Sequence, residues 1–406
     1  MPVTFSDEAA NLENEECRDP QALKRPPPGQ REASGKREAG SCSLLTGRAC
    51  ARWGGIFDMQ FAASDRIRRT TWRRNSCRPW DGASRSSELA FGMPRTDFSR
   101  HNVPFAEIRS GGPPKDGIPS IDAPRFERMQ LGNPTGWSGA LGDNEPVIAL
   151  SIGDDARAYP LRVLIWHELA NDMVGGTPVA ITYCPLCNAA LVFERVVNGR
   201  ALDFGTTGKL RHSDLVMYDR QTESWWQQFT GESIVGAMTG QRLRLIPSRL
   251  ESFGGFRQRF PEGQILVPND PKARNYGRNP YPGYDATGQK PLLYDGSLPD
   301  DIEPMERVVA VETKPGRHEA WTLSLVRSKR TISSADLIIQ WQPGQASALD
   351  KASVRAGRDV GNVIVQRVVG DRLVDVSYDV TFAFAFHAFR PNSPIHQEAS
   401  AGEVAR

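Results

Sequence analysis

The stretch TPVAITYCPLCNAALVFER, Thr177–Arg195, predicts a buried strand, a tight turn and a second apolar strand. Apolar side chains alternate with smaller ones in its first half, which is the pattern of a half-buried strand. They are Val179, Ile181 and Tyr183. Pro185 restrains its own φ angle and favours a turn between Cys184 and Cys187. Two thiols on such a bend can point to the same side of the chain.

Three kinds of chemistry fit this pair of cysteines. As metal ligands, the thiolates need one or two further donors at tetrahedral spacing, and the candidates are His167, before the strand, and His212, in GKLRHSD. Such a set suits a zinc or a copper ion. As a redox pair, the first thiol needs a helix N-terminus that lowers its pKa, whereas the apolar run AALVF follows the turn here. As core residues, both thiols are buried and inert.

Composition excludes several classes of protein. The chain has 406 residues, 39% of them hydrophobic and 24% charged, with a formal net charge of +2. A near-neutral charge without a basic stripe gives no support for nucleic acid as a partner. No apolar run approaches roughly 18 residues, so no membrane span is expected. The six cysteines are too few and too scattered for a disulfide scaffold. The remaining partners are a small molecule or a metal ion.

Residues 1–100 differ from the rest of the chain. They are rich in Arg, Ser, Gly and Pro and poor in apolar side chains, so we expect a disordered or non-native extension. As written, the start lacks the pattern of a secretion signal, which predicts a cytoplasmic protein. If the native start lies downstream, at Met59 or Met93, a periplasmic or secreted protein is expected instead.

Regular elements are predicted from the hydrophobic patterns that follow. PVIALSI, Pro146–Ile152, predicts a strand, GDDA predicts a hairpin turn, and ARAYPL predicts a second strand paired with the first. LRVLIWHELANDMV, residues 161–174, predicts a helix that carries His167 and Glu168 and ends at a Gly-Gly pair. Asn198–Gly199 predicts a hairpin. The phenylalanine spacing in ESFGGFRQRFPEGQIL predicts a short amphipathic helix.

After an irregular loop, the chain begins to resemble its own earlier part. Residues 268–304 are rich in Pro, Gly and Asn but contain tyrosines, which is typical of a lid or the wall of a site. Further on, LIIQWQPGQASALD can be laid over VAITYCPLCNAALV, with Trp341 opposite Tyr183. Gln342 and Gln345 then stand opposite the two cysteines. A purely structural pair should be replaced by small apolar residues, so the amides favour a chemical role for the thiols.

These patterns together predict an α+β, β-dominated fold of two related β-rich lobes with short helices. The first lobe, 103–267, carries the cysteine pair, and the second, 305–395, is a degenerate copy. The loop 268–304 joins them, and 396–406 is a tail.

Three long motifs resemble those of a bacterial family catalogued as domain of unknown function 3179. They are TYCPLCNAALVFER, DFGTTGKLRHSDLVMYDRQTESWWQQFTGE and RNYGRNPYPGYD, and the resemblance covers about residues 103–395. It implies the domain but no reaction, and members of the family are often exported. The features that the resemblance carries over are Cys184, Cys187, His167–Glu168 and the run Asp219…Thr222…Ser224–Trp225.

The functional prediction centres on the cysteine turn. We expect a metal-binding site for zinc or copper, or a thiol redox site, formed by Cys184, Cys187 and His167, with His212 as a further candidate donor. The loop 268–304 is expected to cover it partly. The alternative is a non-catalytic ligand-binding module with structural cysteines, in which aromatic side chains and the long loop hold the ligand. No catalytic residue can be assigned from the sequence.

Overall fold

Strands dominate the computed structural model, which describes residues 92–130 and 136–398, all within the unit Ser76–Arg406. The prediction of an extension over 1–100 falls mostly on residues 1–91, which lie outside the described residues, as does the end of the predicted tail, 399–406. No helix of the described part is long and apolar enough to cross a membrane.

The cysteine turn lies in an antiparallel sheet with the strand order β14-β7-β6-β5. Its strands are β5 (Leu169–Val174), β6 (Thr177–Cys184), β7 (Ala189–Glu194) and β14 (Arg244–Leu245). Every residue from Val179 to Phe193 is buried, because the side chains of β6 and β7 face other elements on both sides of the sheet. The predicted strand, turn and second strand are confirmed.

A second sheet, with the order β15-β3-β4-β16-β2, contains the predicted strand pair before the cysteine sheet. Its strands are β2 (Arg125–Arg128), β3 (Pro146–Ile152), β4 (Asp155–Pro160), β15 (Arg249–Ser252) and β16 (Gln264–Val267). The predicted amphipathic helix is α3 (Phe253–Arg259), which joins β15 to β16 and begins where the Ser252 side chain accepts a hydrogen bond from the Gly255 amide. Phe253 and Phe256 are its buried face.

The later part of the chain forms two further sheets. The first has the order β23-β17-β18-β24, with β17 (Arg307–Lys314), β18 (Arg317–Thr322), β23 (Tyr378–Phe382) and β24 (Ile395–His396). The other has the order β19-β20-β21-β22, with β19 (Thr331–Ser334), β20 (Leu337–Gln342), β21 (Asn362–Val369) and β22 (Arg372–Asp375). Two helices accompany them, α4 (Leu323–Lys329) after β18 and α5 (Ala383–Phe389) between β23 and β24.

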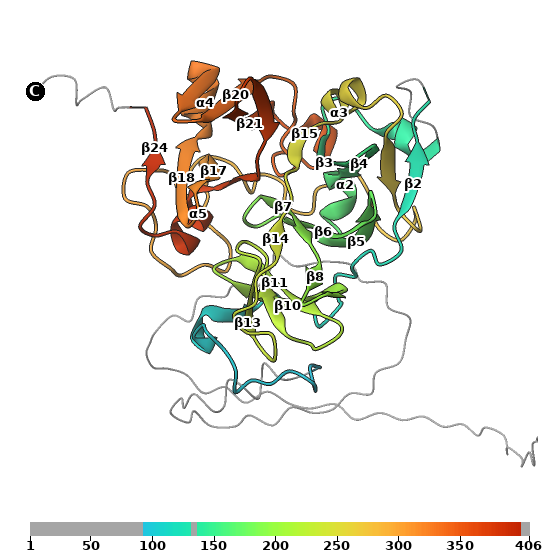
Figure 1. Cartoon of the computed structure of the whole chain (residues 1–406), viewed down its shortest axis with the longest axis vertical. Coiled ribbons are helices and arrows are strands. Elements are labelled where there is room, and N and C mark those ends of the chain that lie inside the picture. The colour runs from blue at the N-terminus through green and yellow to red at the C-terminus, as the bar shows by residue number, and fades with distance from the viewer. Residues whose placement is uncertain (1–91, 131–135, 399–406) are drawn as a thin grey trace, which may run out of the picture. The chain divides into compact units, whose positions relative to one another are not determined.

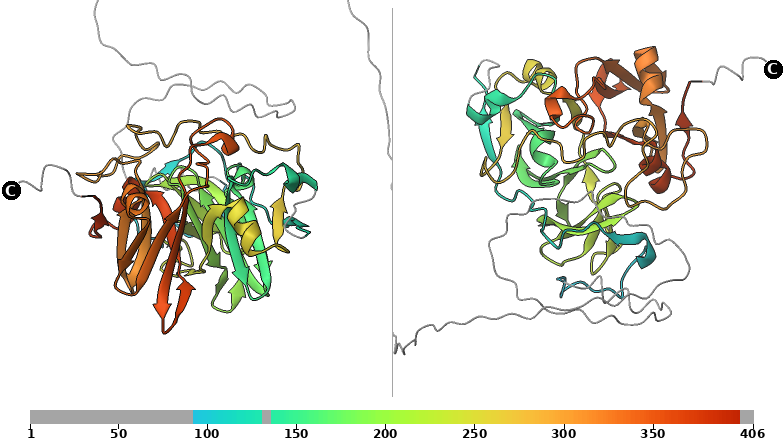
Figure 2. Two further views of the ribbon diagram at one scale, coloured as in Figure 1. Left: turned by 90° about the horizontal axis from the view of Figure 1, so that it is seen from above. Right: turned by 180° about the vertical axis from the view of Figure 1, so that it is seen from behind.

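The pairing pattern of β23-β17-β18-β24 is the same as that of β15-β3-β4-β16. In each set the first two pairings are antiparallel and the last is parallel. In each set a seven-residue helix, α3 or α5, connects the outer strands. Figure 1 shows the orange and red elements of the later set beside the green elements of the earlier one, and the views in Figure 2 keep the two groups adjacent.

A fifth sheet, with the order β1-β10-β11-β12-β13, lies against the cysteine sheet. Its strands are β1 (Ile108–Ser110), β10 (Phe204–Arg211), β11 (Asp214–Asp219), β12 (Trp225–Gln227) and β13 (Glu232–Val235). The predicted hairpin at Asn198–Gly199 is the short ribbon of β8 (Val196–Val197) and β9 (Arg200–Ala201). One continuous hydrophobic cluster includes residues from all five sheets, among them Tyr183, Trp226 and Val380.

The prediction of a helix over 161–174 is wrong. The chain forms a single helical turn, α2 (Leu161–Leu164), and then the strand β5. Glu168 has a φ of 58°, a left-handed conformation that ends the helix and redirects the chain into β5. His167 and Glu168 therefore lie in a connection between α2 and β5. Five of the six residues of β5 are buried, Asn171 and Asp172 among them, whereas Met173 is exposed, so the strand lacks the regular alternation that would distinguish it from a helix in the sequence.

Residues 268–304 contain no helix or strand, as predicted. The loop is anchored by its tyrosines: the Tyr284 hydroxyl donates to the carbonyl of Leu186, inside the cysteine turn, at 3.0 Å. The Leu292 amide donates to the same hydroxyl at 3.2 Å. This loop therefore packs against the cysteine turn.

Candidate metal site

The cysteine turn is held from several sides. Cys184 is the last residue of β6, and Cys187 lies two residues before β7; both side chains are buried and free of any disulfide. The carbonyl of Cys187 accepts hydrogen bonds from the Thr381 hydroxyl at 2.8 Å and from the Phe382 amide at 3.1 Å. Both donors are on β23, so the later part of the chain holds the end of the cysteine turn.

Asp214 reaches the thiols from the neighbouring sheet. It is the first residue of β11 and follows His212 and Ser213, whose φ values of 51° and 68° make a tight turn between β10 and β11. The Ser213 carbonyl lies 3.7 Å from the Cys184 sulfur. One ligand atom from each of Cys184, Cys187 and Asp214 lies within 4.8 Å of the other two, and all three residues are buried. The fold thus brings two sulfurs and a carboxylate oxygen to one point.

The two oxygens of the Asp214 carboxylate have different partners. Its Oδ1 accepts hydrogen bonds from Gln227 Nε2 at 2.6 Å and from the Phe229 amide at 2.9 Å. Its Oδ2 is buried and has no nitrogen or oxygen donor among the described residues. Burial raises the pKa of Asp214 to about 7, against the hydrogen bonds from Gln227, Phe229 and the thiols of Cys184 and Cys187. Thiols are weak donors, and a bound cation would be a stronger partner for this oxygen.

Glu168 adds a second buried carboxylate beside this cluster. No hydrogen bond or ion pair to its side chain is formed within the described part of the chain, and only 8% of the residue is exposed. Burial, together with the nearby Asp214, raises the pKa of Glu168 to about 8. Burial also raises the pKa values of the Cys184 and Cys187 thiols. Four acidic groups therefore share one part of the core, where each is driven towards its neutral, protonated form.

The donor set fits a zinc ion. Donor atoms lie about 2.0–2.3 Å from a tetrahedral zinc, and therefore roughly 3.3–3.8 Å from one another. The mutual separation of at most 4.8 Å between the three donors is close enough for small side-chain rotations to reach this geometry. Zinc binds both thiolates and carboxylates, whereas copper(I) prefers sulfur donors alone. The carboxylate of Asp214 therefore favours zinc over copper.

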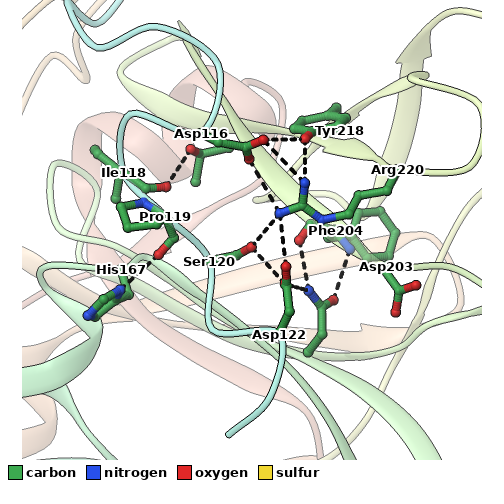
Figure 3. Close-up of polar contacts among 12 residues, drawn as sticks. Asp116, Ile118, Pro119, Ser120, Asp122, His167, Asp203, Phe204, Tyr218 and Arg220 are labelled. Carbon is green, nitrogen blue, oxygen red and sulfur yellow. Dashed lines mark hydrogen bonds and ion pairs between the residues drawn. The ribbon is translucent and has the colours of Figure 1, made fainter. Parts of the chain in front are cut away.

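His167, predicted as the third donor, is held away from this cluster. Its Nδ1 lies 2.8 Å from the carbonyl of Pro119, and its Nε2 lies 2.8 Å from the Tyr276 hydroxyl. A carbonyl only accepts, so Nδ1 carries the proton and Nε2 accepts from the tyrosine. Burial lowers the pKa of His167, which agrees with this neutral form. Figure 3 shows the ring directed at Pro119, and neither nitrogen keeps a free lone pair for a metal.

His212, the other predicted histidine donor, is also outside the cluster. Its Nε2 lies 3.3 Å from an oxygen of Glu107, and its ring packs edge-on against Phe389. Burial lowers the pKa of this histidine. Its contribution to the site is the backbone turn that places Asp214.

The run Asp219…Thr222…Ser224–Trp225 builds a turn. Asp219 Oδ1 accepts from the Thr222 amide at 2.6 Å, and its Oδ2 accepts from the Thr222 hydroxyl at 2.8 Å. Asp219 Oδ2 also accepts from the Trp226 indole at 3.0 Å, and the Met238 amide donates to the Ser224 hydroxyl at 3.0 Å. These contacts close the connection from β11 to β12, which is the structural use of aspartate and threonine at turns.

Sequence reasoning missed Asp214 as a partner of the thiols. The signal that could have found it is an acidic residue at the start of the otherwise apolar strand LVMY, directly after a polar turn. Glu168 was singled out only through the family resemblance, together with His167. The two neighbours have different surroundings in the structure: His167 contacts Pro119 and Tyr276, whereas Glu168 lies near Asp214.

Comparisons with known proteins support the family but identify no activity. A family model with the description "Protein of unknown function (DUF3179)" matches residues 115–393, which is more than half of the chain. The match confirms the resemblance of the three motifs and covers both the cysteine sheet and the later sheets. Neither a curated protein nor a solved structure matches the chain.

Proposed function

Because the chain belongs to the DUF3179 family of proteins of unknown function, its activity has to be inferred from its own residues, and we propose that Cys184, Cys187 and Asp214 bind a zinc ion. The observation that carries this proposal is the convergence of their three ligand atoms within 4.8 Å in the core. Three protein ligands leave one position of a tetrahedral site for a further group. Glu168 is a candidate for that position as a buried carboxylate near Asp214, although its oxygens are not among the ligand atoms that lie within 4.8 Å of one another.

A cation also explains why so many acids are buried together. Without one, each carboxylate and thiol must stay protonated or bear the cost of a buried charge. A zinc ion binds the deprotonated forms and offsets their charges, so that binding releases protons and stabilises the fold. As proposed, the centre supplies Lewis acidity if its fourth position stays open, or a structural link if Glu168 closes it.

The rival proposal, a thiol redox pair, has less support. A reactive thiol needs a lowered pKa, which a helix N-terminus or a nearby cation provides. Burial instead raises the pKa of both thiols, and the residues after the turn form the strand β7. In the rival of a binding module with purely structural cysteines, the protonated thiols of Cys184 and Cys187 donate hydrogen bonds to Asp214, and the convergence of these three groups has no further role.

We also propose that the two parts of the chain, 103–267 and 305–395, descend from one duplicated unit. The shared pairing order of β15-β3-β4-β16 and β23-β17-β18-β24 supports this. In the later part, Gln342 and Gln345 occupy the positions of the thiols, so that part has no metal site of this kind in the proposal. It contributes the contacts from β23 that hold the cysteine turn.

Metal analysis of protein purified without a histidine tag tests the zinc proposal. We expect close to one zinc per chain in the natural protein and almost none in the double variant Cys184→Ser, Cys187→Ser, because the hydroxyls are poor zinc ligands. The matched control is His167→Gln, which replaces a half-buried side chain outside the donor set, and which should keep its zinc. Metal-free natural protein, or loss of zinc in the control alone, would refute the proposal.

A further inference from the structure

A second candidate site is a cavity of about 570 Å³ in the later part of the chain. Its walls are the end of α4, the segment before β17, the residues after Gly357 and the middle of the long loop. Four arginines line it: Arg307, Arg327, Arg330 and Arg358. None of them belongs to the proposed zinc site.

Two of these arginines have no acidic partner. The guanidinium groups of Arg327 and Arg330 form no hydrogen bond or ion pair within the described part of the chain. Both lie at the same indole ring, with the guanidinium carbons 5.5 Å and 4.4 Å from the centre of Trp341. The ring attracts each cation, but the two like charges repel one another. A bound anion would remove that repulsion.

The backbone of Arg330 supports a functional reading of this pair. Arg330 ends α4 with a φ of 63°, a conformation that glycine adopts without strain and that a side chain disfavours. Helix termination alone therefore gives no reason for an arginine here. Strained residues of this kind are concentrated at functional sites, where the strain fixes the direction of a side chain.

The lining of the cavity also includes a buried guanidinium, that of Arg307. Arg307 is 5% exposed, and its Nη2 donates to Asp285 Oδ2 at 2.7 Å. Arg358 Nη1 donates to the other oxygen of Asp285 at 2.9 Å, so that one carboxylate is shared by two arginines. The Nε of Arg307 is buried and has no partner among the described residues, but it has almost no accessible surface and so is closed off from the cavity.

The acidic residues of the lining do not accept hydrogen bonds from Arg327 or Arg330. Both oxygens of Asp359 accept from the Gly344 amide, each at 3.0 Å, and Glu306 accepts from the Ser324 amide at 3.2 Å. Glu303 is exposed at the rim. Arg327 and Arg330 thus offer free N–H donors at the cavity, while three of its four carboxylates are engaged: Asp359 and Glu306 by backbone amides, and Asp285 by two arginines. A ligand with acceptor oxygens matches the two free guanidinium groups.

We propose that this cavity binds a small multivalent oxyanion, with its charged oxygens held by Arg327 and Arg330. Guanidinium groups pair with carboxylate and phosphate oxygens through two parallel hydrogen bonds, which lysine cannot do. Both kinds of anion share this chemistry. Binding at this cavity requires no metal and does not depend on the proposed zinc site.

Titration calorimetry with two probes, inorganic phosphate and citrate, tests the proposal. The natural protein is expected to bind at least one of them at one site per chain. Binding of phosphate alone indicates a phosphorylated ligand, and binding of citrate alone indicates a polycarboxylate. The variant Arg327→Gln, Arg330→Gln is expected to bind about tenfold more weakly or worse. Both residues are exposed, so the fold should be retained.

The matched control is Lys329→Gln, Arg317→Gln, which removes the same charge from exposed residues outside the cavity. Its affinity for the probe should stay close to that of the natural protein. The proposal is overturned if neither probe binds the natural protein at millimolar concentration, or if the control loses as much affinity as the arginine variant.

Discussion

Asp214→Asn is expected to weaken zinc binding by more than about 100-fold, because Asp214 is proposed as a direct ligand. Loss of a residue that only hydrogen-bonds to a metal ligand costs roughly 10–100-fold in affinity. The asparagine keeps the shape of the side chain and an oxygen for Gln227 and the Phe229 amide, but it lacks the negative charge. The metal-free variant should be at least as stable as the metal-free natural protein, since a buried carboxylate has been removed. Competition titration with a chelator and thermal unfolding measure the two effects.

The control for this experiment is Asp379→Asn. Asp379 is also buried, its pKa is likewise raised to about 7 by burial, and its Oδ1 accepts from the Ala190 amide at 3.0 Å. It is not one of the three converging ligands. Zinc affinity should therefore survive this change. Equal affinities in the natural protein and in Asp214→Asn would show that Asp214 is not a ligand.

Asp285→Asn is expected to destabilise the protein by about 3–5 kcal/mol, the cost of removing one partner of a buried ion pair. Asp285 has a side chain that is 0% exposed, and it accepts hydrogen bonds from Arg307, Arg358 and the Ser347 hydroxyl. Without it, the guanidinium of Arg307 is left in the core without a counter-charge. The free energy of unfolding in urea measures the loss.

The pH dependence of this loss follows from the pKa of Asp285. Burial raises that pKa, but Arg307, Ser347 and Arg358 together hold it below its usual value. The stabilisation is therefore complete above the pKa of the unfolded chain, about 3.9, and is lost as the pH falls through the lower folded value. The difference between the natural protein and Asp285→Asn should be constant near neutral pH and shrink below about pH 4.

An exposed ion pair provides the comparison for Asp285. Asp143, whose side chain is 64% exposed, lies 2.9 Å from Arg257, and Asp143→Asn should change stability by less than about 1 kcal/mol. The assignment of the buried ion pair would be contradicted if Asp285→Asn lost no more stability than Asp143→Asn. It would also be contradicted if the loss of stability in Asp285→Asn were unchanged at pH 3.

The local elements could be predicted from the sequence where one pattern dominated. The strand–turn–strand of Thr177–Arg195, the strand Pro146–Ile152 and the helix after Ser252 all appear as expected. The prediction of a helix over 161–174 failed because β5 does not alternate apolar and polar residues: it buries Asn171 and Asp172 and exposes Met173, so its pattern does not indicate a strand. The hydrophobic pattern around Glu168 does not predict its left-handed backbone conformation.

The candidate site could be predicted only in part, for a different reason. The two cysteines are close in the sequence, so a local turn was enough to bring them together. Asp214 lies near them only because one sheet packs on another, and the distance between residues in the sequence does not predict such packing. The hydrogen bond from Tyr276 to His167 depends on the long loop, so the sequence could not reveal that the lone pair of this imidazole is occupied.

X-ray absorption spectroscopy at the zinc edge of the natural protein tests the central claim most directly. We expect two sulfur neighbours at about 2.3 Å and oxygen neighbours at about 2.0–2.2 Å, without the scattering pattern of an imidazole. A spectrum with fewer than two sulfurs, or with histidine in the first shell, would contradict the convergence of Cys184, Cys187 and Asp214 on one metal ion.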